Sequence, residues 1–274
     1  MCIRDRSRLI DYDAQFREYF NSWYEKNKQD YLKPEQVEER LHSLYEEWAE
    51  QERSALDAMD AAALNQLFIE YAECGEVPDL VCEAIARKGA AGERGLYDLY
   101  RAGMLSVSSV ITIINLLAQM KSRLPYNDYM ELLSQSQEED EIAEAAAEAL
   151  AEAPSEFFEQ ILSAFENARS IWGRELLMNA LVHIKADARL YDGLRQLLEA
   201  SENTAFIAAM MAESGIERCL DDLKALEYSK DINYIDYIEI CNAIEALGGE
   251  TARDRQFEGD AYYEMMKSPD AGLN

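Results

Sequence analysis

Few side chains in this sequence stand at spacings that could support catalysis or metal binding. His183 could act as a general base, but no serine or cysteine nucleophile is evident near it in the sequence, and a histidine near a helix C-terminus is common. The run of acids at 138–141 could bind a divalent cation. A single helix cannot converge four consecutive carboxylates on one ion, so these residues are expected to cap a helix start instead. We therefore predict no catalytic residue, no metal ligand and no cofactor-binding residue.

Cysteine usage is typical of a reducing compartment. The chain has five cysteines, an odd number, and none is arranged as CxxC. Only two histidines, His42 and His183, accompany them, so a Cys/His zinc site has little support. The phosphate-binding and hydrolase patterns GxxxxGK[ST], GxGxxG, HExxH and GxSxG are absent. The turn expected at Gly92-Glu-Arg-Gly95 is read as helix punctuation. These features predict a cytoplasmic protein with free thiols.

One short polar and aromatic stretch is a candidate protein-binding surface. Tyr234, Ile235, Asp236 and Glu239 combine aromatic and acidic side chains at an expected helix start, and could grip a basic helix or peptide. Their neighbours Tyr237 and Ile238 are expected in the core. Ile235 falls off the main apolar face, which makes it the better surface candidate of the two isoleucines.

A second candidate surface is basic. Arg94 and Arg101 lie in a locally basic stretch, 87–101, of an otherwise acidic chain. This stretch could balance charge within the protein, or it could recognise an acidic partner.

The charge of the whole chain limits the class of partner. Of 274 residues, 54 are acidic and 26 are basic, which gives a net charge of −28. Such a field repels phosphate backbones and anionic lipid headgroups, so we expect no nucleic acid and no membrane among the partners. It favours a protein or peptide of basic character, although a solvated acidic surface also explains it.

The elements that must position these residues all have helical periodicity. Aromatic residues recur every three or four positions over 9–28, and Pro34 is expected to open a second helix whose stripe ends at Trp48. These stripes could form a ligand or peptide groove, but core packing is favoured. Residues 102–120 carry no charge, but Ser108, Thr112, Asn115 and Gln119 form a polar stripe. A buried helix is therefore favoured over a membrane span, with a strand at 107–114 as the second choice.

Similar helix ends recur at a fixed interval along the second half of the chain. Leu150, Leu181, Ala212 and Leu247 each precede a turn and a further amphipathic helix, at intervals of 31, 31 and 35 residues. A constant period with one helix pair per unit is typical of an α-solenoid. We expect an all-α protein of about fifteen helices with no sheet.

Residues 142–250 resemble the short HEAT-like repeats of bacterial HEAT-repeat proteins. The resemblance is carried by the Ala-rich helix ends, by Glu213-Ser-Gly-Ile-Glu-Arg218 and by Ala243-Ile-Glu-Ala-Leu-Gly-Gly249; residues 60–103 resemble it more weakly. It implies a right-handed α-solenoid of helical hairpins. The expected division is an N-terminal aromatic hairpin at 7–53, repeats at 54–250 and a C-terminal capping helix and tail at 251–274. The first six residues resemble a translated sequencing adapter and are left out of this division.

The resemblance implies a fold and leaves two functions open. The first is a non-catalytic scaffold or adaptor that binds another protein through an acidic solenoid surface. The alternative is an enzyme or enzyme accessory of the HEAT-like lyase type, since some HEAT-like proteins are bilin lyases or DNA glycosylases. A glycosylase needs a basic surface to bind DNA, which a net charge of −28 disfavours.

Overall fold

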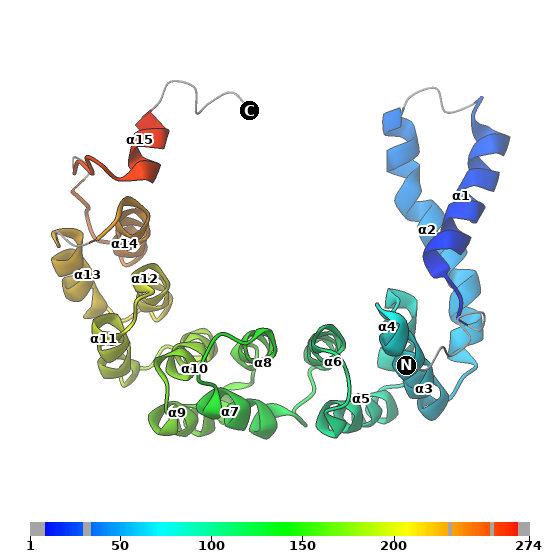
Figure 1. Cartoon of the computed structure of the whole chain (residues 1–274), viewed down its shortest axis with the longest axis horizontal. Helices are drawn as coiled ribbons and strands as arrows, with labels where there is room; N and C mark the ends of the chain where they lie inside the picture. The colour runs from blue at the N-terminus through cyan, green and yellow to red at the C-terminus, as the bar shows by residue number, and fades with distance from the viewer. Residues whose placement is uncertain (1–8, 30–33, 230–231, 253–254, 268–274) are drawn as a thin grey trace. The chain divides into compact units, whose positions relative to one another are not determined.

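The computed structural model describes residues 9–29, 34–229, 232–252 and 255–267, and these residues form an all-α protein (Figure 1). They contain fifteen α-helices and a 3₁₀-helix at Ser155–Phe157, and no strand occurs among them. The expected all-α class and number of about fifteen helices are therefore confirmed for the described residues. Within the described chain, no helix has both the length and the apolar character needed to cross a membrane.

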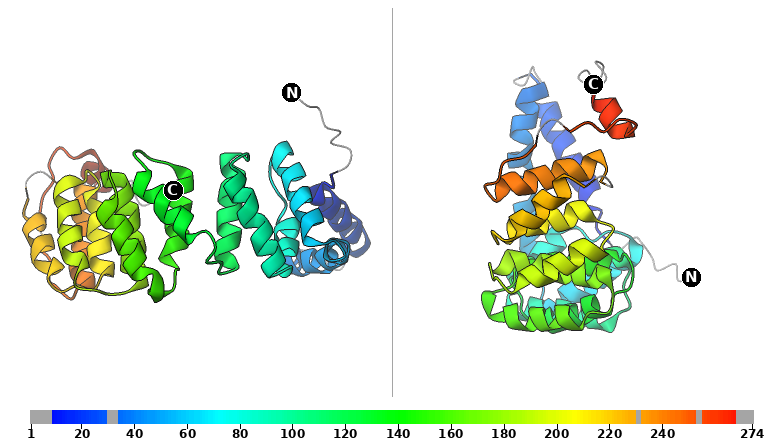
Figure 2. Two further views of the ribbon diagram at one scale, coloured as in Figure 1. Left: turned by 90° about the horizontal axis from the view of Figure 1, so that it is seen from below. Right: turned by 90° about the vertical axis from the view of Figure 1, so that its left-hand side faces the viewer.

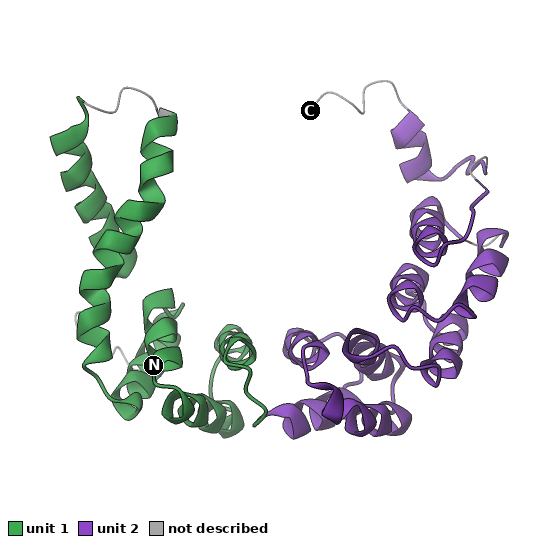
Figure 3. Ribbon diagram, turned by 180° about the vertical axis from the view of Figure 1, so that it is seen from behind, with its two compact units in different colours: residues 1–124 green, residues 125–274 purple. Residues whose placement is uncertain are grey.

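The chain forms two compact units, residues 1–124 and 125–274 (Figure 3). Unit 1 contains α1 (Tyr12–Asn27), α2 (Pro34–Asp57), α3 (Ala61–Cys74), α4 (Asp79–Arg87), α5 (Ala90–Ala102) and α6 (Val107–Gln119). Unit 2 contains α7 (Tyr126–Gln135), α8 (Glu141–Ala151), α9 (Phe158–Asn167), α10 (Ile171–Ile184), α11 (Leu190–Ala200), α12 (Thr204–Glu213), α13 (Cys219–Glu227), α14 (Tyr234–Ala246) and α15 (Ala261–Lys267). The domain boundary expected after residue 53 lies inside α2, which continues to Asp57.

Helix starts follow local capping chemistry. The side chain of Asp140 accepts hydrogen bonds from the backbone amides of Ile142 and Ala143 at 2.8 and 3.2 Å. Asp60 and Asn233 cap α3 and α14 in the same way. These bonds satisfy backbone donors that have no partner within the helix. The acidic run at 138–141 therefore contains a helix cap, as its sequence predicts.

The core of unit 1 lies between α2, α3, α4, α5 and α6. Phe68 and Leu96 are fully buried within it. The turn expected at Gly92–Gly95 is wrong, because the chain turns at Gly89 and both glycines lie inside α5. A Cβ atom on Gly92 would overlap the carbonyl oxygen of Ile85, and one on Gly95 would overlap the side chain of Asn65. The two glycines let α5 approach its neighbours closely.

Most of the uncharged segment 102–120 forms helix α6, Val107–Gln119, so the alternative of a strand at 107–114 is wrong. Ile113, Ile114 and Leu117 are buried, whereas Asn115 and Gln119 are exposed. Val107, the first residue of the helix, is 49% exposed. The polar stripe thus faces outward, and it becomes the wall of a cleft described below.

In unit 2, α8, α10, α12 and α14 pack against one another in sequence, with α10 in contact with both α8 and α12. These four helices form a row, and α7, α9, α11 and α13 pack against one side of that row (Figure 1). Figure 2 shows these helices side by side with nearly parallel or antiparallel axes. The apolar faces of α8 and α10 supply much of the core, including Ala146, Leu150, Leu177 and Leu181.

Polar side chains bridge helices about 30 residues apart in both units. Arg189 pairs with Glu159, and the Tyr191 hydroxyl donates to Asp222 at 2.7 Å; these partners are 30 and 31 residues apart. Ser170, which caps α10, also donates to the backbone carbonyl of Ser136, 34 residues earlier. The separations are close to the interval between the Ala/Leu-rich helix ends in the sequence.

Candidate functional site

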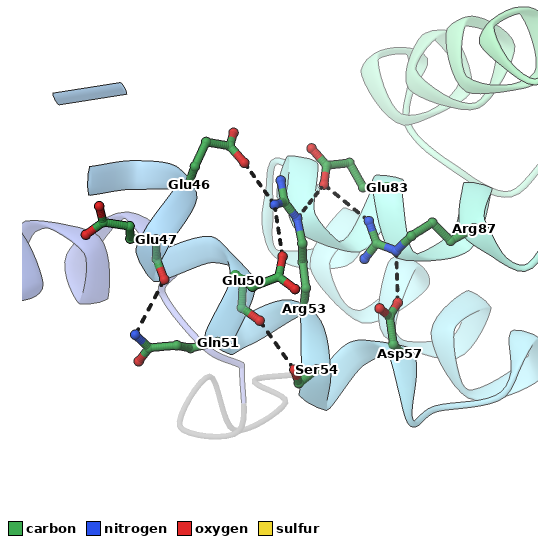
Figure 4. Close-up of polar contacts among 9 residues, drawn as sticks. All are labelled: Glu46, Glu47, Glu50, Gln51, Arg53, Ser54, Asp57, Glu83 and Arg87. Carbon is green, nitrogen blue, oxygen red and sulfur yellow. Dashed lines mark hydrogen bonds and ion pairs between the residues drawn. The ribbon is translucent and has the colours of Figure 1, made fainter. Parts of the chain in front are cut away.

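The side chains of Arg53 and Arg87 form an ion-pair network that links α2 to α4 (Figure 4). Arg53 donates to Glu46 at 2.9 Å and to Glu83 at 3.2 Å. Arg87 donates to Asp57 at 2.9 Å and to Glu83 at 3.3 Å. Both arginines are therefore neutralised within the protein and fix the position of α4 against α2.

Beside this network, unit 1 contains a cleft of about 530 Å³, which we call the aromatic cleft. It is lined by residues 9–13, by Tyr45 and Trp48 of α2, by Tyr71 at the end of α3, and by residues 76–80. The Tyr12 and Trp48 rings meet edge to face at 6.3 Å between centroids, and those of Tyr45 and Trp48 lie 5.6 Å apart. The Tyr71 hydroxyl donates to the carbonyl of Ile10 at 2.8 Å, which holds the segment before α1 against the cleft.

The rim of the aromatic cleft is acidic. Its lining includes four carboxylates, from Asp11, Asp13, Glu76 and Asp79, and no lysine or arginine among the described residues. Asp11 is occupied as the cap of α1, where it accepts from the amide of Ala14 at 2.9 Å. The other three make no ion pair with a described residue, in contrast to Glu83. The cleft therefore combines an aromatic wall with three carboxylates that have no cationic partner in the part of the chain that the structure describes.

Burial and nearby carboxylates shift the pKa values of two phenols in the aromatic cleft. Burial raises the pKa of Tyr45, and the carboxylates of Asp79 and Glu83 raise it further. Burial also raises the pKa of Tyr12, with smaller contributions from Tyr71 and Glu52. Both phenols stay protonated at neutral pH, so their hydroxyl groups remain hydrogen-bond donors.

A second cleft, of about 660 Å³, lies between α4 and α6, and we call it the polar cleft. Figure 1 shows these two helices on the same side of α5. Helix α4 contributes one face, with Asp79 at its start and Arg87 at its end, and α6 contributes its polar stripe of Thr112, Asn115 and Gln119. Cys82 also lines this cleft, and burial raises the pKa of its thiol to about 11. At neutral pH the thiol is protonated and is a poor nucleophile.

The structure places Tyr234, Ile235, Asp236 and Glu239 on the first turns of α14, in unit 2. Tyr234 packs against the rings of Phe257, Tyr262 and Tyr263, and its backbone amide donates to Asp260 at 3.0 Å. Asp236 bonds to the capping residue Asn233, and Glu239 to Asn242. Ile235 is 51% exposed. Tyr234 thus contributes to the packing of the C-terminal segment, and the binding role of this group stays a prediction.

Arg94 and Arg101 lie on α5, in unit 1. Their guanidinium groups lie 5.7 and 5.9 Å from the ring centroid of Tyr97, and Arg94 pairs with Asp98 at 3.1 Å. Both arginines are exposed. They form one local cluster on α5, separate from the candidate group on α14, and recognition of an acidic partner by this cluster also stays a prediction.

His183, which the sequence presents as a possible base, lies outside the two clefts. His183 is exposed; its Nδ1 atom lies 2.7 Å from the carbonyl of Asn179 and its Nε2 atom 3.3 Å from Glu213. Across the described residues, no group of three or more His, Cys, Asp or Glu side chains is positioned to hold a metal ion.

The chain matches no known protein-family model. No curated protein and no solved structure is significantly similar to it.

The sequence indicates the aromatic stripes as a possible groove, but it does not identify the acids that complete the aromatic cleft. Asp13 of α1 is 63 and 66 residues from Glu76 and Asp79, which lie just before and at the start of α4, and no local pattern joins the three. The polar stripe of α6 does carry a usable signal. An uncharged helix with amides on one face must direct that face toward solvent, a partner or a cleft.

Proposed function

We propose that this protein is a non-catalytic scaffold or adaptor that binds a basic segment of another protein. The observation that carries the proposal is the rim of the aromatic cleft, where three carboxylates lack a cationic partner among the described residues. A cation that enters this cleft would meet carboxylates on the rim and aromatic rings behind them. Both attract positive charge, and the negative field of the whole chain would increase the rate of encounter.

The proposed architecture is a right-handed α-solenoid of HEAT-like hairpins. The polar bridges between partners 30 to 34 residues apart support it, since they join corresponding helices of successive pairs. A solenoid presents an extended surface on which a partner segment can lie. We further propose a cytoplasmic location, which agrees with the free thiols of Cys74, Cys82, Cys219 and Cys241.

The alternative, an enzyme or accessory of the HEAT-like lyase type, lacks a supporting arrangement in either cleft. An enzyme of this kind would need an activated nucleophile or base at the site. Cys82 is the nucleophilic side chain of the polar cleft, and its raised pKa of about 11 leaves nearly all of it as the unreactive thiol.

Binding of labelled peptides tests the proposal. Fluorescent peptides of equal length that are basic, neutral or acidic are titrated with the protein, and anisotropy is measured at two salt concentrations. We expect the basic peptide to bind, with an affinity that falls as salt rises. The double substitution Asp13→Asn, Glu76→Gln should weaken its binding by about tenfold, since each rim carboxylate contributes about half of a 1.4 kcal/mol change.

A matched control separates the cleft from net charge. The double substitution Glu18→Gln, Glu38→Gln removes the same two charges from exposed positions of unit 1 outside the cleft. It should lower affinity much less than the cleft variant. Equal losses for the two variants, or equal binding of all three peptides, would contradict the proposed site.

A further inference from the structure

The aromatic and polar clefts share one residue, Asp79, the first residue of α4. Its side chain is exposed and makes no ion pair with a described residue. Its carboxylate contributes to the raised pKa of Tyr45, in the aromatic cleft, and of Cys82, in the polar cleft. Asp79 therefore acts electrostatically on both sides of the helix start, and the two clefts adjoin at this residue.

The two clefts differ in the chemistry they offer a ligand. The aromatic cleft presents rings and three carboxylates without an ion pair to a described residue, which suit a cationic side chain. In the polar cleft, Glu83 and Arg87 already pair with each other at 3.3 Å, so their charges largely cancel. Apart from Asp79, the polar cleft offers a ligand the exposed amides of Asn115 and Gln119, which make no hydrogen bond to another described residue.

A side-chain amide both donates and accepts hydrogen bonds, and so does each peptide unit of an extended chain. A helical ligand could not use these amides through its main chain, because its backbone groups are already paired with one another. A polyamine could not use them fully either, since a protonated amine donates but does not accept. The pair of amides next to an acidic cleft therefore fits an extended polypeptide with basic side chains.

We propose that the aromatic and polar clefts form a single groove for an extended basic segment of a partner protein. The inference rests on the proposed function and specifies its ligand. A cationic side chain enters the aromatic cleft, the neighbouring main chain lies along α6 on Asn115 and Gln119, and Asp79 contacts the ligand where the two clefts adjoin.

The test uses the full chain, an eight-residue peptide of alternating arginine and glycine, and spermine as a polycation without peptide groups. Four variants are compared with the original protein: Asp13→Asn in the aromatic cleft, Asn115→Ala with Gln119→Ala in the polar cleft, Asp79→Asn, and Asn127→Ala as an exposed control. All the substituted side chains are exposed, so the variants should fold, and circular dichroism verifies this. Affinities come from calorimetry, and backbone NMR shifts locate the bound peptide.

We expect the polar-cleft variant to bind the peptide about tenfold more weakly while its affinity for spermine is unchanged. Asp79→Asn should weaken the binding of both ligands, and Asn127→Ala should change the binding of neither. Addition of the peptide should shift backbone resonances of both α2 and α6. If Asp13→Asn weakens peptide binding but Asn115→Ala with Gln119→Ala does not, the proposal of a single groove is wrong and the proposed function stands. If spermine loses as much affinity as the peptide in the polar-cleft variant, the ligand class is wrong. If no variant affects peptide binding, both proposals fail.

Discussion

The Nε atom of Arg53 lies 3.2 Å from Oε2 of Glu83, and this contact joins α2 to α4 across 30 residues of sequence. Arg53 also lies within 4 Å of Glu46 and Glu50, so its removal leaves three carboxylates without their shared cation. We predict that Arg53→Met, which keeps the apolar stem, lowers the free energy of unfolding by about 1 kcal/mol. Urea unfolding at low salt measures this change.

The salt dependence of the Arg53→Met effect tests whether the loss of stability is electrostatic. Near 1 M salt the Debye length falls to about 3 Å, so most of the loss should disappear. Arg94→Met serves as a control, because Arg94 makes an exposed pair with Asp98 within one helix, and its effect should stay within about 0.5 kcal/mol. A loss at Arg53 that is the same at both salt concentrations would instead indicate packing.

Two glycines inside helices of unit 2 should respond differently to alanine. A Cβ atom on Gly173 would overlap the backbone carbonyl of Leu133, which belongs to α7 and cannot move aside alone. On Gly193 it would lie 2.6 Å from Cε of Met178 and 2.9 Å from the Phe165 ring, of which the methionine end is flexible. Alanine gains about 1 kcal/mol of helix propensity, against an overpacking cost of about 1–3 kcal/mol. We predict clear destabilisation for Gly173→Ala and a smaller change for Gly193→Ala.

Thermal unfolding of the two alanine variants, followed by circular dichroism, measures this difference. A Gly173→Ala protein as stable as the original would mean that α7 and α10 can separate without cost. Gly103→Ala provides a comparison of another kind, because Gly103 has φ of 63° with open space around it, so only backbone strain opposes the substitution.

The buried carboxyl group of Glu175 should make stability depend on pH. Its side chain in α10 is 4% exposed, and burial raises its pKa, partly opposed by a hydrogen bond from Ser201. A raised pKa means that the folded state holds the proton more tightly than the unfolded state, whose pKa is about 4.3. The contribution of Glu175 to stability is therefore lost as pH rises from about 4.3 through the folded pKa.

Glu175→Gln removes that ionisation and keeps an acceptor for Ser201. We predict that the variant is more stable than the original protein at pH 7, and that its advantage shrinks as pH falls toward about 4. Urea midpoints across this range measure the difference. Glu148→Gln, at an exposed position of α8, should show no such trend. A constant difference between Glu175→Gln and the original at every pH would indicate a packing effect.

The helices could be predicted from the sequence because each buries an apolar stripe with 3.6-residue spacing and starts at a recognisable cap. Asp140 and Pro34 illustrate this. The failure at Gly92 and Gly95 has a physical cause. Glycine usually ends a helix, but here its missing side chain is required for close packing between helices, and only the tertiary structure reveals that contact. Likewise the apolar stripe of α2 continues to Leu56, which is 3% exposed, so the helix passes the expected boundary.

The candidate site could be predicted only in part. The aromatic stripes suggest core or groove, and the structure gives both roles to the same rings: Tyr12 and Trp48 are 7% and 5% exposed, yet they line the aromatic cleft. The acids of its rim come from the start of α1 and from the segment that opens α4, and these are joined by the Tyr71–Ile10 hydrogen bond and the Tyr12–Tyr71 ring contact, between residues 61 and 59 apart. Separations of this size are not visible as a local pattern.

Cysteine alkylation provides a readout of the proposed groove in the original protein. Cys74 is exposed and lines the aromatic cleft, whereas Cys82 is half-buried, lines the polar cleft and has a pKa raised to about 11 by burial. Because the thiolate is the reactive form, iodoacetamide should modify Cys74 quickly and Cys82 slowly. An arginine-rich peptide at about ten times its Kd should slow both reactions about tenfold.

Mass spectrometry of timed digests measures each cysteine separately, and Cys219 is the internal reference. Its thiol is buried in unit 2 and has a pKa of about 11, so it reacts only through opening of the fold. Protection of Cys74 and Cys82 with no change at Cys219 would support occupation of the whole groove. Protection of Cys74 alone would confine the peptide to the aromatic cleft. Equal protection of all three would mean that the peptide stabilises the fold without covering either cleft.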